Sequence, residues 1–264
     1  MNFKNKTLWI TGASSGIGRA FAIELSKKKC QLILSGRNKG SLDQVSKICK
    51  VNGSSTLVIP FDLGDENSVN LAAHSVIDKN LNIHGLYHFG GISQRSLASE
   101  TKLSIDRKIF EVNFFGTIAL TKKILPILLK NKKAQIGVTT SIVGKFGFPY
   151  RSSYSATKHA LHGFFESLRI ENKENGLIIS MIVPGRIKTS ISKNAIDKEG
   201  NSYNKMDPGQ DKGKTAESTV KIIVNKLEND KKEILVGGKE IIMVYVRRFF
   251  PSLYYYLSKK IKPF

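Results

Sequence analysis

Two residues near the middle of the chain have types and a spacing that suit proton transfer. Tyr154 and Lys158 are four positions apart, so on a helix their side chains project from the same face, one turn apart. A nearby ammonium group favours the phenolate and makes a tyrosine a better proton donor near neutral pH than its ordinary pKa of about 10 allows. Because solvated helices carry the same pair, the rest of the chain must decide between a catalytic and a surface role.

A glycine-rich segment near the N-terminus has the pattern of a dinucleotide site. The apolar run 7–10 ends at Thr11-Gly12-Ala13-Ser14-Ser15-Gly16-Ile17-Gly18, and a helical pattern follows. Glycines let the backbone approach a pyrophosphate, and the start of a helix offers free N–H groups and a positive dipole end. The alternative is a tight strand-to-helix turn without a ligand. The residues expected to contact the nucleotide here are Gly12, Ser14, Ser15, Gly16, Ile17 and Gly18.

The residue after the second predicted strand, 31–35, indicates which dinucleotide is preferred. An acidic side chain there would accept hydrogen bonds from the ribose hydroxyls and favour NAD. The chain instead has Arg37, whose guanidinium suits a 2′-phosphate through forked, charge-assisted bonds. We therefore predict NADP(H). The alternative is an exposed arginine in a surface turn.

Further candidates follow the third and fourth predicted strands, 56–60 and 85–89. Asp62 could accept from the adenine amino group, with the Leu63 N–H as a donor, or it could cap the helix that begins near Glu66. Gly90 and Gly91 would allow a flat ligand to approach closely. A histidine inside a strand, such as His88, is expected to be a hydrogen-bonded core group.

Strands and helices alternate along the whole chain. The remaining strands are predicted at 135–140, 177–183 and 234–236, and helices at about 40–52, 66–79, 104–130, 154–173 and 215–229. This alternation favours a single α/β domain, a doubly wound and mainly parallel sheet with helices on both faces. Ligands of such sheets bind beyond the carboxyl ends of the strands. Six candidates fall at predicted strand ends: Gly12, Arg37, Asp62, Gly90, Ser141 and Pro184-Gly185.

Composition limits the other possibilities. The 264 residues are 41% hydrophobic and 24% charged, as in a soluble globular protein. The net charge of +21 suggests an anionic partner, but the lysines are scattered and no motif requires nucleic acid, so none is expected. Two cysteines without a C-x-x-C motif fit a reducing compartment. With no leader and no long apolar run visible, we expect a cytoplasmic protein, and we expect no metal site.

Two segments outside this alternation remain. The stretch from about 188 to 213 is polar and is predicted to be a mobile flap. Residues 238–264, which follow the catalytic domain of 1–237, alternate aromatic and basic residues, and Pro251 divides them into two short helices. This extension could lie on an anionic membrane surface as an amphipathic element, or pack on the subunit or over the substrate pocket. Both readings stay open.

Taken together, these motifs resemble the short-chain dehydrogenase/reductase family over about 1–237. Thr11-Gly12-x-x-x-Gly16-x-Gly18, Asn113, Ser141, Tyr154, Lys158 and Pro184-Gly185 occur in the family's order and spacing. The segment 91–96 and the long tail look closer to the dehydrogenase/reductase member 7 branch. The resemblance implies a Rossmann fold with a seven-stranded sheet and a homodimer or homotetramer. One motif departs: His88-Phe89-Gly90-Gly91 replaces the usual Asn-Asn-Ala-Gly, which puts in doubt the hydrogen bonds from this strand to the neighbouring helix.

The resemblance also implies roles for single residues. Tyr154 would be the general acid or base, Lys158 would lower its pKa and bind the nicotinamide ribose, and Ser141 would hydrogen-bond the substrate oxygen. Asn113 would hold a water behind Lys158, and Ile187 and Thr189 would bind the carboxamide. We expect an NADP(H)-dependent oxidoreductase for a ketone, aldehyde or alcohol of an apolar, lipid- or steroid-like substrate, in a pocket that includes Phe146, Phe148 and Tyr150. The alternative is a catalytically silent nucleotide-binding scaffold or sensor.

Overall fold

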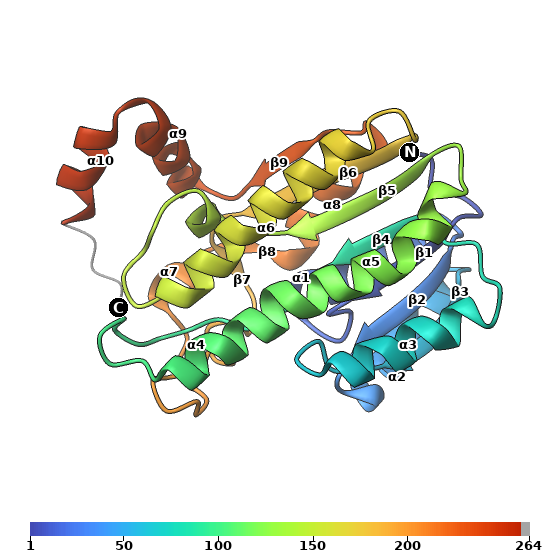
Figure 1. Cartoon of the computed structure of the whole chain (residues 1–264), viewed down its shortest axis with the longest axis horizontal. Coiled ribbons are helices and arrows are strands. Elements are labelled where there is room, and N and C mark those ends of the chain that lie inside the picture. Colours follow the sequence, from blue (N-terminus) through green and yellow to red (C-terminus); the bar gives the residue numbers. More distant parts are fainter. Residues whose placement is uncertain (260–264) are drawn as a thin grey trace.

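A computed structural model describes residues 1–259 and contains one seven-stranded parallel sheet in the order β3-β2-β1-β4-β5-β6-β9 (Figure 1). The order reverses direction beside β1, as the predicted doubly wound fold requires. The alternating pattern therefore predicted the fold class correctly. The strands are β1 (Thr7–Thr11), β2 (Gln31–Gly36), β3 (Ser55–Pro60), β4 (Gly85–His88), β5 (Ala134–Thr139), β6 (Leu177–Pro184) and β9 (Glu233–Val236).

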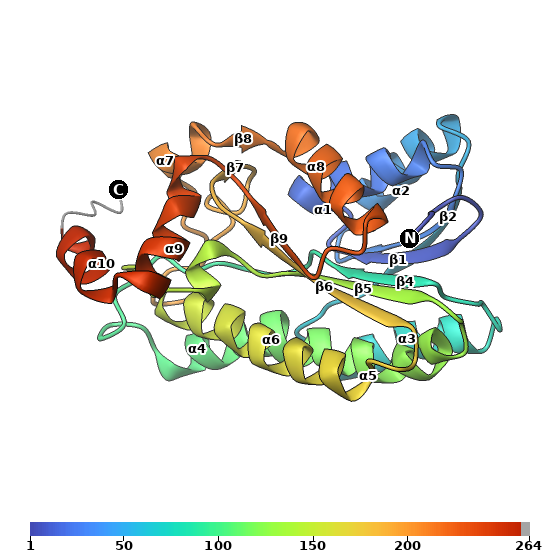
Figure 2. The same ribbon diagram turned by 90° about the horizontal axis from the view of Figure 1, so that it is seen from above.

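Helices cover both faces of the sheet in two layers (Figure 2). One layer holds α1 (Gly16–Ser26), α2 (Lys39–Val51) and α8 (Ala216–Glu228), and the other holds α3 (Glu66–Ile77), α4 (Leu103–Phe110), α5 (Gly116–Leu129) and α6 (Ser152–Glu171). The strands are apolar almost throughout, since a parallel sheet is buried on both faces.

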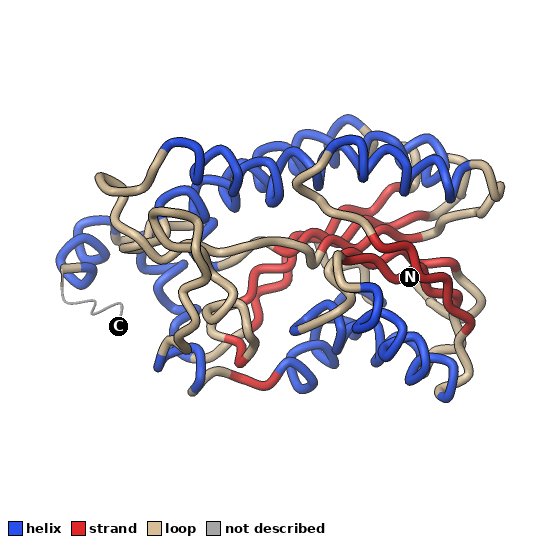
Figure 3. Tube along the Cα trace, turned by 90° about the horizontal axis from the view of Figure 1, so that it is seen from below, coloured by secondary structure: helices blue, strands red, loops and turns tan. Residues whose placement is uncertain are grey.

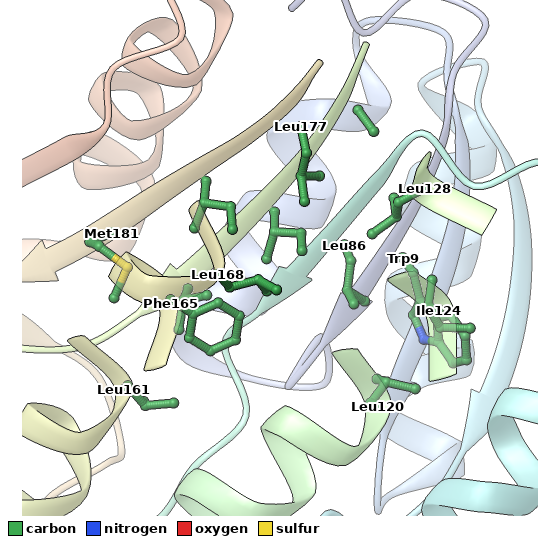
Figure 4. Packing of buried hydrophobic residues seen from close by; sticks show 14 of the residues in the cluster. Trp9, Leu86, Leu120, Ile124, Leu128, Leu161, Phe165, Leu168, Leu177 and Met181 are labelled. Atoms are coloured by element: carbon green, nitrogen blue, oxygen red, sulfur yellow. The ribbon is translucent and has the colours of Figure 1, made fainter. Parts of the chain in front are cut away.

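The core on the α5–α6 face is packed from strand and helix side chains in close contact (Figure 4). Trp9 and Leu86 of the sheet lie near Leu120 and Ile124 of α5, and Phe165 of α6 is fully buried. Burying a side chain of this size stabilises the fold by about 1.5–3 kcal/mol. The N-terminal half of α6, which carries Tyr154 and Lys158, is thereby held firmly against the sheet.

The predicted helix over 104–130 is interrupted by one π-helical turn, Glu111–Phe115, between α4 and α5. Such a turn inserts an extra residue and often marks a functional position; here it contains Asn113. The combined stretch Leu103–Leu129 is long and apolar enough, with a mean hydropathy of 1.4, to span a membrane. Core helices have the same property, and α5 packs against α3 and the sheet.

The cap of α3 differs from one of the two expectations for Asp62. Asp65, not Asp62, caps this helix, and its carboxylate accepts from the N–H groups of Asn67 and Ser68. Asp62 lies one turn earlier and accepts from the Gly64 N–H at 2.9 Å. The capping position falls at Asp65 because the chain makes a turn over residues 62–65 before the helix begins.

The segment predicted as a flap folds into short elements at the carboxyl end of the sheet, where the longer loops gather (Figure 3). They are β7 (Ile187–Lys188), α7 (Pro208–Asp211) and β8 (Lys214–Thr215). The tail forms α9 (Ile242–Phe249) and α10 (Pro251–Ser258), divided at Pro251 as predicted. Short 3-10 turns occur at Ile142–Gly144 and Lys239–Ile241. The last part of the predicted extension, 260–264, lies outside the described residues.

Candidate active site

A cavity of about 830 Å³ lies at the carboxyl ends of the strands. It brings together nearly all the residues predicted from the sequence, although they come from the ends of six different strands and the segments that follow them. Among the predicted residues, those that line it are Gly12, Ser14, Ser15, Gly16, Ile17, Gly18, Arg37, Asp62, Leu63, Gly90, Ser141, Phe146, Phe148, Tyr154, Lys158, Pro184, Gly185, Ile187 and Thr189.

The end of the cavity beside α1 fits a dinucleotide. Gly12 has a φ of 67° and lies so close to the β4 loop that an added Cβ would be 2.6 Å from the Gly90 nitrogen. Glycine is required there both by the backbone angle and by the contact. Ser15 makes no side-chain capping bond at the start of α1. The N–H groups of that first turn are therefore available to bind a pyrophosphate.

Arg37 lies at the edge of this end of the cavity. Its side chain is exposed and forms no ion pair with any described residue, while the following Asn38 caps α2. No carboxylate follows β2 at this point of the chain. The position therefore offers an unpaired guanidinium to a negatively charged group on an adenosine ribose.

Tyr154 and Lys158 project into the cavity from the first two turns of α6. The Lys158 ammonium lies 5.6 Å from the centre of the Tyr154 ring. The same ammonium donates a hydrogen bond of 2.9 Å to the Thr139 carbonyl at the end of β5. Both residues are buried. The pair therefore lies in a buried site and not on a solvent-exposed face of the helix.

Burial shifts the pKa values of both residues of the pair. Burial raises the pKa of Tyr154, and the charges that oppose the rise belong to Arg95 and Arg151, together with a hydrogen bond to Ser141. Lys158 is not among these opposing groups, and the expectation that Lys158 lowers the pKa of Tyr154 stays a prediction. Burial also lowers the pKa of Lys158 from 10.5 to about 8. Because this value lies above neutral pH, Lys158 remains mostly charged at pH 7.

Asn113 is fully buried behind the pair. Its side-chain amide donates to the Ile92 carbonyl at 2.9 Å and to the Thr157 hydroxyl at 3.2 Å, and its carbonyl oxygen accepts from the Ile92 N–H at 2.8 Å. It therefore ties the loop after β4 to α6 and faces the protein interior. It does not line the cavity, but a Cβ on Gly91 would lie 3.0 Å from its amide oxygen and 3.8 Å from the Lys158 ammonium.

His88, the first residue of the departing motif, supplies a link from β4 to the neighbouring helix. Its Nε2 lies 3.0 Å from the Thr121 hydroxyl of α5. Burial, with the nearby charge of Lys158, lowers the pKa of His88 to about 3, so the ring is neutral. The prediction of a hydrogen-bonded core group is confirmed. The loss of the asparagines therefore does not disconnect this strand from α5.

Comparison with known proteins agrees with this geometry. The family model described as short chain dehydrogenase matches residues 6–200. The chain belongs to this family. As a short-chain dehydrogenase it is an oxidoreductase with a nucleotide-binding Rossmann fold, and its relatives place it in the member 7 branch, as the segment 91–96 and the tail suggested.

Two relatives and two solved structures illustrate the similarity. "Dehydrogenase/reductase SDR family protein 7-like" of Anopheles gambiae is 36% identical over 98% of this chain and 84% of its own. Human "Dehydrogenase/reductase SDR family member 7" is 35% identical over 96% and 76%. A short-chain dehydrogenase from Burkholderia phymatum, solved with NAD, superposes with a TM-score of 0.83 at 21% identity, covering 100% of this chain and 98% of its own. One from Burkholderia cenocepacia, solved with NADP, gives 0.80 at 21%, covering 98% and 99%. At this identity the structures support the fold alone.

Away from α1, the cavity of this short-chain dehydrogenase has an apolar end that is partly built by the tail. Phe146 and Phe148 line it together with Met243 of α9 and Leu257 of α10. Tyr254 of α10 is buried, stacks on Phe146 at 5.4 Å and donates a hydrogen bond of 2.7 Å to the Gly147 carbonyl. The inner face of the tail therefore packs over the pocket, which is one of the two alternatives that the sequence left open.

Tyr150 does not line the cavity, contrary to the prediction. The chain turns sharply at this residue, with a φ of 63°, and the following Arg151 faces the cavity instead. Sequence reasoning grouped Tyr150 with the phenylalanines because all three precede α6. A left-handed turn at a tyrosine is rare and has no signal in the residue type.

Three charged residues of the site were missed. Arg95, Arg151 and Asp207 line the cavity and form a buried cluster in which both guanidiniums bind the one carboxylate. Asp207 lies in the predicted flap, so this ion pair anchors that segment to the loop after β4. Arg95 and Asp207 are 112 residues apart. A pair this distant cannot be recognised from one sequence.

Proposed function

We propose that this short-chain dehydrogenase is an NADP(H)-dependent oxidoreductase that interconverts a ketone or aldehyde and an alcohol. The observation that carries the proposal is the convergence of Tyr154, Lys158 and Ser141 on one cavity with the Gly12 turn and Arg37. The bound nicotinamide would supply or accept the hydride. The apolar lining by Phe146, Phe148 and the tail favours an apolar substrate.

In this proposal Tyr154 moves the proton. Burial keeps its phenol neutral, which is the form that can protonate the oxygen of a carbonyl as it becomes an alcohol. Ser141 would hold that oxygen by a hydrogen bond. Lys158, fixed by the Thr139 carbonyl, would orient the nicotinamide ribose, and Asn113 would stabilise this arrangement through α6.

Replacing Tyr154 with phenylalanine tests the proton-transfer role. The variant should still bind NADPH but lose about 100-fold to 10,000-fold in kcat, the usual contribution of a general acid. Turnover is measured by the absorbance of NADPH with a panel of ketones, and nucleotide binding by calorimetry. Unchanged turnover in Tyr154→Phe would refute this mechanism. Nucleotide binding by the wild type without turnover on any carbonyl would favour the alternative, a sensor or scaffold.

Arg37 is the residue proposed to select NADP(H). Arg37→Ala should weaken NADPH binding while leaving NADH binding nearly unchanged, because only NADPH carries the 2′-phosphate that a guanidinium would bind. Lys39→Ala is the matched control, since Lys39 is an exposed cation two residues away that pairs with Asp43. Equal loss of both nucleotides in Arg37→Ala, or an equal effect of the control, would contradict the proposed preference.

We further propose that the outer face of the tail contacts an anionic membrane surface, so that the protein is cytoplasmic and peripheral. Large apolar side chains are exposed there beside Arg248, among them Phe249 (67% exposed) and Phe250 (63%). Amphipathic helices with such a face bind at the headgroup level.

Vesicle flotation tests this contact. Wild type should float with phosphatidylserine vesicles and much less with neutral ones, and Phe249→Ser with Phe250→Ser should remain in solution. The control is Leu71→Ser with Ile170→Ser, two residues exposed to 72% and 71% on other helices. Flotation of the tail variant as efficiently as the control would exclude the tail as the membrane contact.

A homodimer or homotetramer is proposed from the family. Light scattering, which gives the molar mass in solution, measures the oligomeric state.

A further inference from the structure

The charged cluster in the cavity carries more positive than negative charge. Asp207 accepts from the Nη2 of Arg95 at 2.6 Å and from the Nη2 of Arg151 at 2.7 Å. All three side chains are buried or nearly so, with 2%, 12% and 5% of the surface exposed for Arg95, Arg151 and Asp207. Within residues 1–259, two guanidiniums pair with one carboxylate, which leaves one positive charge uncompensated.

The other described carboxylates that line the cavity, Asp62 and Glu240, form no ion pair with either arginine. Asp62 accepts from the Gly64 N–H, and Glu240 accepts from the Arg186 N–H. An uncompensated buried charge is costly. This arrangement is therefore expected where a ligand provides the counter-charge.

The two arginines differ in how many of their donors are occupied. Nearly all N–H donors of Arg95 are occupied, since its Nη1 also donates to the Ser93 hydroxyl and the Gln94 carbonyl. To the part of the chain that the structure describes, Arg151 donates one side-chain hydrogen bond, to Asp207, and its guanidinium lies over the Phe148 ring, 4.6 Å from the ring centre. A guanidinium has more donors than this, so Arg151 can still present a pair of N–H groups to an anion.

The position of Arg151 separates it from the proposed 2′-phosphate site at Arg37. Arg37 follows β2, whereas Arg95 and Arg151 follow β4 and β5, on the other side of β1. Arg151 immediately precedes α6, three residues before Tyr154. Phe148, on which it stacks, lines the apolar end of the cavity.

We propose that Arg151, held in place by Asp207 and Arg95, binds an anionic group of the substrate, either a carboxylate or a phosphate. The substrate would then combine three parts: a carbonyl or alcohol at Tyr154, an apolar portion against Phe146 and Phe148, and a charged end at Arg151. This inference rests on the proposed oxidoreductase function and narrows its substrate class from apolar to amphiphilic and acidic.

The charge balance of the cluster supports this proposal. Burial, with the nearby charge of Arg95, lowers the pKa of Arg151 to about 10, although Asp207 acts in the opposite direction. One carboxylate is thus not enough to offset the cost of burying both cations. A bound anion would reduce this cost, and Arg is the residue best suited to bind it in a forked geometry.

Calorimetry on the full chain in the presence of NADP⁺, which cannot reduce a ketone, tests the proposal without requiring turnover. The probes are undecanoic acid with a ketone on its penultimate carbon, the methyl ester of that acid, and the phosphate monoester of the corresponding keto alcohol. Wild type should bind one or both anionic probes about 10-fold to 100-fold more tightly than the ester, the range of a hydrogen bond to a charged group. The anionic probe that binds more tightly identifies the preferred group as a carboxylate or a phosphate.

Arg151→Gln should reduce the ratio of the affinities for the anionic probe and the ester to near one. Arg151→Lys keeps the positive charge but not the forked pair of N–H donors, so it should retain part of this preference. Arg107→Gln, an exposed arginine on α4 outside the cavity, should retain all of it. Equal affinity of wild type for the acid, the phosphate and the ester would overturn the proposal, as would a preference that survives in Arg151→Gln. NADPH oxidation is followed with the same probes. Preferential binding of an anion without turnover would count against the proposed reaction and still support the anion site.

Discussion

Replacing Lys158 with methionine should remove a pH-dependent part of the protein's stability. Burial lowers the pKa of Lys158 from 10.5 to about 8. Between these two values the unfolded chain binds more protons than the folded chain, so the free energy of unfolding of the wild type rises as the pH increases. The free-energy cost of burying the charged lysine is present in full below the pKa of the folded state and disappears above the pKa of the unfolded state. Methionine has a similar shape and does not titrate.

The size of the effect follows from these pKa values. One pKa unit corresponds to about 1.4 kcal/mol, so between about pH 7 and about pH 10 the wild type should gain roughly 2–3 kcal/mol relative to Lys158→Met. The hydrogen bond to the Thr139 carbonyl does not affect this comparison strongly, because a neutral amine can still donate it. Groups that titrate elsewhere in the molecule cancel in the difference.

Urea unfolding at a series of pH values measures the effect. The single tryptophan, Trp9, is fully buried beside Phe61 and reports global unfolding by fluorescence. Lys221→Met is the control, since Lys221 is exposed on α8 and its removal should give a difference that does not vary with pH. A flat difference for Lys158→Met as well would refute the reasoning and show that Lys158 is not desolvated in the folded protein.

Three further changes test contacts described above. Thr121→Val should destabilise the protein by about 1–3 kcal/mol, because it leaves the buried His88 without its hydrogen-bond partner. Urea unfolding measures the change in stability, and an unchanged stability would contradict the link between β4 and α5. Gly12→Ala should abolish nucleotide binding in calorimetry, since the added Cβ would meet the β4 loop at 2.6 Å. Tyr254→Phe should cost about 0.5–1.5 kcal/mol through loss of the bond to Gly147 and raise KM more than it lowers kcat. An unchanged KM would separate the tail from the substrate pocket.

The fold and the shared edge of the site could be predicted because both depend on local pattern. Alternating strands and helices specify a parallel sheet, and parallel strands end at one edge, so Gly12, Arg37 and Ser141 had to meet there. The order of the strands could not be derived from periodicity alone and is known from the structure.

The details that were missed depend on tertiary contacts. The choice of Asp65 over Asp62 as a helix cap depends on one turn of backbone. The pKa of Tyr154 depends on its burial and on the charges of Arg95 and Arg151, which approach it only after the loops that follow β4 and β5 have folded together. Asp207 looked like part of a polar flap, although its side chain is buried. Polarity along the sequence indicates solvent exposure only when no partner of opposite charge lies across the fold.

The tail gives the site a property that a closed pocket would not have. Tyr254 and Leu257 touch the cavity wall from the same short helix, α10, that exposes Tyr255 and Tyr256 on its other side. A surface that binds the outer side and favours one position of this helix must change the affinity of the cavity for its ligand. By thermodynamic reciprocity, the ligand must then change the affinity for that surface by the same factor. If the proposed membrane contact and substrate pocket are correct, attachment and substrate binding are two coupled equilibria of one helix, and the coupling can be measured from either side.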